Sequence, residues 1–280
     1  MAHNAESDLP ATIYHYCGPD SFRNILKSKQ LWLSDVHCMN DSTEQTWLID
    51  KAKQLLSDPR YQDDEKKYLQ VVVENFDWMA LDPHAICFSE NPDLLSQWRA
   101  YAEDGKGCSV GFSTSWIESQ KHLYPRHYVA LWPVEYKESR QDELLNHYIE
   151  TYLTRMKNCE NQRKEGMKLV TAIYALSGAC KNPHFEEENE IRLLVMEPRD
   201  PDAFNKNYTQ GISERFYRKR NDHHISYFTL AFPEDAVTSI HLGPQNDAKH
   251  NNSELKKFLL ENGYDLDQLE IKISDIPYRS

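Results

Sequence analysis

The chain has little glycine and proline, 9 and 13 of its 280 residues, and no low-complexity tract. This composition excludes collagen-like and Gly/Pro-rich disordered classes. No apolar run approaches the roughly 20 residues that a bilayer span needs. The opening residues MAHNAESDLP also lack the basic and apolar segments of a secretion signal. We therefore expect a cytoplasmic protein that folds along its whole length and does not enter a membrane.

Paired cysteines are absent too. The six cysteines stand singly, without the CxxC spacing of zinc or thioredoxin-type sites: Cys17, Cys38, Cys87, Cys108, Cys159 and Cys180. We expect them to be reduced and mostly buried, and we expect no resident metal.

An excess of positive charge is also missing, since the net charge is −12. Broad binding to phosphate backbones needs a basic face, so we expect none. Two local basic clusters remain, Arg215, Arg218, Lys219 and Arg220, and Arg163, Lys164 and Lys168. A solvated surface is the simpler interpretation of both.

Predicted strands and helices alternate along the chain. Short apolar runs bounded by turn residues predict strands over 12–17, 31–34, 84–89, 105–112, 127–136, 190–196, 225–230, 237–242 and 269–273. Helical periodicity predicts helices over 21–28, 42–56, 63–79, 92–101 and 253–262, and a long helical stretch over 140–180 that caps a sheet. No flexible linker divides them. We predict one α+β domain over residues 1–280, with mixed or antiparallel sheets, flanking helices and a helical insertion at about 140–180.

Three short units carry residues suited to chemistry. In the first, His15 stands between two tyrosines at a strand end, before a Gly-Pro turn, where it can meet a ligand; a core histidine is the alternative. In the second, the strand end CFSE precedes a helix with Trp98 and Tyr101 on neighbouring turns and then a glycine-bearing strand. This pattern is typical of a ligand wall, although both aromatics also suit a core.

The third unit is acidic. Its acidic residues run from Glu186 straight into the predicted strand, and in a strand Glu188 and Glu190 would point to the same face. Two such carboxylates repel unless a cation such as Arg192 pairs with them, whereas an active site uses the same charge to stabilise a developing cation. A solvated acidic edge is the simpler alternative.

The order of these units resembles the ADP-ribosyltransferase superfamily: an apolar-Tyr-His-Tyr strand, a turn, a short helix and LWLS, then CFSENPDLLSQWRAYA, then an acidic strand. The whole chain is also similar to a bacterial family known only as domain of unknown function 2971. The matching segments are YHYCGPDSFRNILKSKQLWLS, MNDSTE, CFSENPDLLSQWRAYAEDGKGCSVGF, FEEENEIRLL, SIHLGPQND and IKISDIPYR.

The transferase resemblance implies that the protein cleaves NAD and transfers ADP-ribose to an unknown acceptor macromolecule. Glu190 would stabilise the ribosyl cation and Glu188 would orient or deprotonate the acceptor. The implied NAD-binding residues are His15, Tyr16, Ser34, Ser89, Trp98 and Tyr101, with Asn40, Asp41 and Glu44 lining the same cleft. One position departs from the pattern, because many transferases have tyrosine where this chain has Cys87.

Two other classes stay open. A metal-dependent nuclease would use the Glu-x-Lys pairs at Glu135 and Glu270, with Asp265 or Asp267 as a further acid. A zinc site from His84, Cys87, His223 and His224 has weaker support, because the ligand spacing is lacking. A non-catalytic module would bind a nucleotide or a partner in the same cleft. By analogy with the family, either a toxin or a phage-defence role would suit such a protein.

Overall fold

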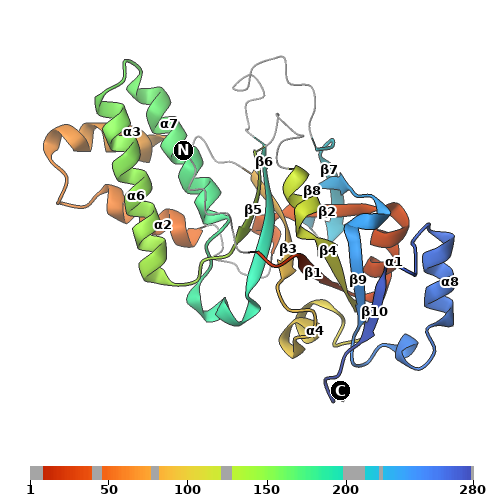
Figure 1. Ribbon diagram of the computed structural model, residues 1–280. Coiled ribbons are helices and arrows are strands. Elements are labelled where there is room, and N and C mark those ends of the chain that lie inside the picture. Colours follow the sequence, from red (N-terminus) through yellow and green to blue (C-terminus); the bar gives the residue numbers. More distant parts are fainter. Residues whose placement is uncertain are drawn as a thin grey trace.

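The computed structural model describes residues 9–39, 46–76, 82–120, 128–197, 212–220 and 223–278. It contains a large, mostly antiparallel sheet with helices on its flanks and a separate group of helices to one side (Figure 1). The predicted α+β class is therefore confirmed. Among the described helices, none is long and apolar enough to cross a membrane.

The described strands form one sheet in the order β10-β9-β4-β1-β3-β2-β8-β7, with β6 and then β5 branching from β3. Their bounds are β1 Thr12–Cys17, β2 Gln30–Asp35, β3 Asp82–Ser89, β4 Cys108–Ser113, β5 Tyr128–Pro133, β6 Glu190–Glu197, β7 Phe216–Arg220, β8 His223–Ala231, β9 Val237–Leu242 and β10 Glu270–Ile273. Only the pair of β10 with β9 is parallel among the described strand pairs.

Two amphipathic helices cover the main core of this sheet. Helix α1 (Pro19–Ser28) buries Phe22 and Leu26, and α8 (Ser253–Glu261) buries Leu255 and Leu259, all in one apolar cluster with alternate residues of the strands. Two short helices, α4 (Leu95–Tyr101) and α5 (Thr114–Ser119), flank β4 in the sequence. The apolar residues that alternate along the strands and those that repeat every 3.6 residues along the helices thus pack into the same core.

The helical stretch predicted over 140–180 is a pair of helices, α6 (Glu138–Lys157) and α7 (Gln162–Ser177). We expected this pair to cap the sheet. Instead, it packs with α2 (Thr46–Leu56) and α3 (Asp63–Phe76) around a second apolar core, which reaches the sheet through Met196 and Trp132 (Figure 1). The reason is that α6 and α7 bury apolar residues against α2 and α3 rather than against the strands.

The sheet opens in its middle, and this opening positions the candidate site. Strand β1 pairs with β4 along its whole length, but with β3 only at Tyr14 and Ser89. Strand β3 is paired along its whole length with β6, and with β2 only at its other end. The backbone of β3 between these points therefore faces a gap between β1 and β2.

Most predicted elements are confirmed, and β1 and β9 have the predicted bounds. The helix predicted from position 92 was placed too early, because α4 begins at Leu95 after an extended Leu94. The strand predicted from 105 begins at Cys108. Strand β7 was not predicted. The predicted ends at 42, 79 and 127 lie outside the described residues.

Candidate functional site

Two adjoining hollows lie at the opening in the sheet. Their volumes are about 390 and 830 Å³, and both are lined by His15, Tyr16, Trp32, Ser34, Tyr101 and Arg218. The smaller hollow is also lined by acidic and basic side chains from the start of β6, and the larger one by polar residues of α1. Because their walls are shared, we treat the two hollows as one cleft.

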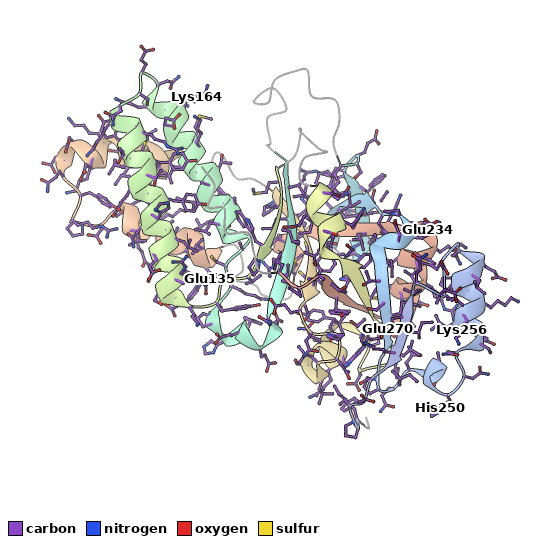
Figure 2. All side chains as sticks on the ribbon, in the orientation of Figure 1. Glu135, Lys164, Glu234, His250, Lys256 and Glu270 are labelled. Atoms are coloured by element: carbon purple, nitrogen blue, oxygen red, sulfur yellow. The ribbon has the colours of Figure 1, made fainter. Side chains whose placement is uncertain are left out.

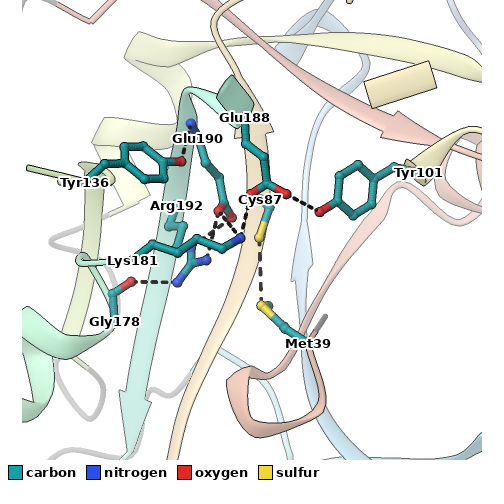
Figure 3. A network of polar contacts seen from close by, with 9 residues as sticks. All are labelled: Met39, Cys87, Tyr101, Tyr136, Gly178, Lys181, Glu188, Glu190 and Arg192. Atoms are coloured by element: carbon teal, nitrogen blue, oxygen red, sulfur yellow. Dashed lines mark hydrogen bonds and ion pairs between the residues drawn. The ribbon is translucent and has the colours of Figure 1, made fainter. Parts of the chain in front are cut away.

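Glu190 and Arg192 form a bidentate ion pair at the acidic end of the cleft (Figure 3). Both distances, Nε to Oε1 and Nη2 to Oε2, are 2.8 Å. Arg192 is fully buried and also donates to the Gly178 carbonyl oxygen at 3.1 Å. The Lys181 ammonium lies 3.4 Å from Glu190 Oε2. Glu190 is therefore held in one orientation by two buried cations.

The surroundings of Glu190 keep its carboxyl group ionised. Burial alone would raise its pKa, but the Arg192 guanidinium and then the Lys181 ammonium outweigh this effect and lower the pKa to about 2. Such a group cannot exchange a proton near neutral pH. It can only act through its fixed negative charge.

Glu188 lies beside this pair but in a different backbone element. A 3₁₀ helix, Pro183–Glu188, ends at Glu188, and Asn189 then adopts a left-handed conformation with φ 43° before β6 begins. The prediction that a strand places both carboxylates on one face is therefore wrong. They meet at Lys181 instead, whose ammonium is 2.5 Å from Glu188 Oε2, while Tyr101 donates its hydroxyl to Glu188 Oε1 at 2.9 Å (Figure 3).

His15 reaches across the opening between β1 and β3. Its Nδ1 lies 2.9 Å from the Cys87 carbonyl oxygen, and its ring contacts Phe88 edge-on. Because a carbonyl only accepts hydrogen bonds, Nδ1 carries the proton and Nε2 is left as an acceptor. Burial lowers the pKa of His15 below its ordinary value, and the bond to Cys87 opposes this effect. The ring is thus a neutral cleft residue at pH 7.

Ser34 and Tyr16 also line the cleft. Arg218 donates to Ser34 Oγ at 3.1 Å, and its guanidinium lies over the Trp32 ring at 5.4 Å. The Tyr16 hydroxyl, however, donates to the Asn91 carbonyl oxygen at 2.7 Å. The ring of Tyr16 therefore lines the cleft, while its hydroxyl is hydrogen-bonded to the loop that follows β3.

Two predicted NAD-binding residues do not line the cleft. Trp98 is fully buried, packs edge-on against Tyr16 and donates its Nε1 to Asp93 at 2.6 Å. Ser89 is buried, and its Oγ accepts from the Asn91 amide at 3.2 Å. Both side chains support the loop at the edge of the cleft. Asn40, Asp41 and Glu44 lie outside the described residues.

Cys87 lies on the wall of the smaller hollow. Its Sγ is 3.9 Å from Met39 Sδ, and it stands directly across from Arg192 on β6 (Figure 3). Aromatic rings reach the cleft from other positions, among them Trp32 and Tyr101, which line both hollows.

Sequence reasoning missed two cations of the site, Lys181 and the Ser34-bound Arg218. Lys181 lies in a loop with no periodic pattern, and Arg218 was placed in a solvated basic cluster. The alternation of FYRKR was the one signal that predicts a strand with Arg218 on a defined face.

The two nuclease pairs lie far from each other, and neither pair lines the cleft, although the Glu135 carbonyl oxygen accepts from the Lys181 amide at 3.1 Å. Figure 2 shows Glu135 beside the helical group and Glu270 on β10 at the far side of the sheet. Glu270 is exposed and pairs with Lys272 at 2.9 Å. Within the described residues, no three His, Cys, Asp or Glu side chains form a group that could hold a metal ion.

Comparison with known proteins identifies one family. Residues 97–193 match the model of a family described as Protein of unknown function (DUF2971). The matched segment runs from α4 into β6 and contains Tyr101, Lys181, Glu188, Glu190 and Arg192, so it includes the acidic end of the cleft. Neither the curated proteins nor the solved structures contain a significant match to the chain.

Proposed function

We propose that the cleft binds NAD, breaks its nicotinamide–ribose bond and transfers ADP-ribose to an acceptor. One observation carries this proposal: His15 from β1 and the carboxylates of Glu188 and Glu190 line the same hollow of about 390 Å³. This is the combination of ribose acceptor and fixed negative charge that departure of nicotinamide requires.

The chemistry follows from the charges. When the bond between C1′ of the ribose and the nicotinamide nitrogen breaks, its electron pair neutralises the pyridinium and leaves an oxocarbenium-like ribose. Glu190 remains ionised, and a preorganised carboxylate stabilises such a cation. An acceptor nucleophile then donates a lone pair to C1′ and releases its proton. Glu188, at the less buried end of the pair, is the group that receives this proton.

Lys181 and Arg192 limit how strongly Glu190 can stabilise the ribosyl cation. They already compensate the charge of Glu190, so the ribose hydroxyls must compete with them for its oxygens. This observation favours a second candidate function, a nucleotide-binding module without turnover. That module would bind NAD and release no nicotinamide.

Nicotinamide release from NAD by the purified protein, with cell extract as acceptor, separates the two functions. Glu190→Gln should lose turnover while keeping most NAD affinity, because its carboxylate acts mainly in the transition state. Glu187→Gln is the matched control, since this exposed neighbour lines neither hollow. Binding without release identifies the module, and absence of both binding and release rejects both functions. Nicotinamide release in cells would also test a toxin or phage-defence role.

A further inference from the structure

A row of aromatic rings extends from the cleft to the edge of the sheet. Trp32 on β2 stacks on Tyr227 of β8 with centroids 4.5 Å apart, and Tyr227 contacts Phe216 of the edge strand β7 at 5.6 Å. Tyr227 stands directly across from Ser34 on one side and Phe216 on the other. The rings therefore share one face of the sheet, the face that carries the cleft wall.

This face is not part of the core. The alternate residues of the same strands, Leu31, Leu33 and Phe228, are almost fully buried, whereas Trp32 and Phe216 are 42% and 41% exposed. Trp32 and Phe216 are among the few large apolar side chains that stay exposed in the described part of the chain. Exposed adjoining rings of this kind indicate a binding surface.

The charge beside the rings is positive, in contrast to the chain as a whole. Arg218 reaches from β7 to the Trp32 ring and Ser34, whereas Arg215 and Lys219 alternate with it along the same segment and point to the other face. Glu214 is the acid that precedes them. In a chain of net charge −12, this segment carries positive charge, which attracts phosphates.

We propose that this aromatic row, Trp32, Tyr227 and Phe216 with Arg218, binds the acceptor, and that the acceptor is a single-stranded nucleic acid. This inference rests on the proposed function. Exposed rings next to arginine suit unpaired bases, because each base has a free π-face and each phosphate a negative charge. A duplex hides these faces, and a surface with so few cations does not hold one.

The row also leads to the site of reaction. Trp32 and Arg218 belong to the aromatic row and to the wall of both hollows. A base stacked at this end brings a ring nitrogen or an exocyclic amine toward the ribose. That nitrogen would form the new bond to C1′ as nicotinamide leaves, and its proton would pass to Glu188.

Binding is measured first, without NAD, by fluorescence anisotropy of a labelled single-stranded oligonucleotide of mixed sequence. Phe216→Ala and Trp32→Ala should each weaken binding about 5-fold or more. Tyr217→Ala is the matched control, because Tyr217 lies on the same strand, is 65% exposed and points to the other face. Thermal melting verifies that each variant is folded. Equal loss in Tyr217→Ala, equal affinity for duplex, or no binding would overturn the proposal.

A second measurement adds NAD labelled on its adenosine half and follows the label. Label on the oligonucleotide, reduced in Phe216→Ala, is the expected result. Label on protein alone, or nicotinamide release without oligonucleotide binding, would reject the acceptor proposal and leave the NAD chemistry standing. Oligonucleotide binding that depends on Phe216, with no nicotinamide release, would support the aromatic row as a nucleic-acid site and reject the proposed transfer.

Discussion

Arg192 holds both carboxylate oxygens of Glu190, two residues earlier on the same strand, at 2.8 Å each. Residues two apart on a strand point to the same face, so the backbone of β6 alone brings this pair together. Lys181 and Glu188 add one charge of each sign. The acidic end of the cleft is therefore a balanced set of two carboxylates and two cations, and each member depends on the others.

Removing Arg192 should destabilise the protein strongly. Arg192→Leu leaves Glu190 buried with only Lys181 as a cation, which costs about 3–5 kcal/mol of unfolding free energy. Urea denaturation measures this loss. Arg140→Leu, which breaks an exposed pair with Glu143, should cost less than about 0.5 kcal/mol. A double change of Arg192 and Glu190 to leucine should be less damaging than Arg192→Leu alone; an additive result would show that the two side chains are not coupled.

Acid should unfold the protein partly through Glu190. Its pKa falls from the ordinary 4.5 to about 2 in the folded state, so between these values the unfolded state binds the proton and the folded state does not. The ionised Glu190 carboxylate contributes roughly 3 kcal/mol to the free energy of unfolding above about pH 4.5. This contribution is lost as the pH falls toward 2.

Glu190→Gln should remove this part of the acid slope in urea midpoints measured from pH 7 to 3. Glu234→Gln is the control, because its carboxylate is exposed and paired with Lys29 at the surface. It should keep most of the slope. An unchanged slope in Glu190→Gln would mean that Glu190 is not the titrating group.

Two glycines should respond in opposite ways to alanine. Gly166 lies inside α7, where a Cβ would meet Val71 at 3.4 Å and Met156 at 3.6 Å, which is ordinary contact. Gly166→Ala should stabilise the protein by about 0.5–1 kcal/mol, because helix formation costs alanine less entropy. A Cβ on Gly107 would lie 2.0 Å from the Cys17 carbonyl oxygen, so Gly107→Ala should destabilise by about 1–3 kcal/mol. Thermal melting of both variants tests the sign of each effect.

The fold was largely predictable because most elements carry a clear period. In strands such as β1 and β9 the apolar residues alternate or form a continuous run, and in α6 and α7 they recur about every 3.6 residues. Strand β7 was missed because its residues FYRKR are mostly charged, as suits an exposed edge. Periodicity also gave no means of deciding which core α6 and α7 join.

The site was less predictable, because a pattern along the chain does not say which face turns to a cleft. Tyr101 and Trp98 stand three residues apart on α4, yet one lines the cleft and the other is buried beneath it. Lys181 joins the site from a loop between α7 and β6. Only the folded chain brings that lysine to Glu188 and Glu190.

NAD binding should depend on the neutral form of His15. With Nδ1 donating to Cys87, Nε2 is the acceptor that a ribose hydroxyl requires. Because burial lowers the pKa of His15 below its ordinary value, this acceptor persists at neutral and higher pH. NAD affinity measured by calorimetry should therefore be flat from pH 8 to 7 and fall only in acid, where Nε2 gains a proton.

His15→Asn tests this directly, because the shorter amide can still donate toward Cys87 but has no counterpart of Nε2. NAD affinity should fall about 5- to 10-fold, the cost of one lost hydrogen bond, and the decline at low pH should disappear. His147→Asn, on the exposed face of α6, is the matched control and should change neither. If His15→Asn binds NAD as tightly as the parent protein, the ribose does not contact His15, and the cleft then holds its nucleotide through the Arg218 side instead.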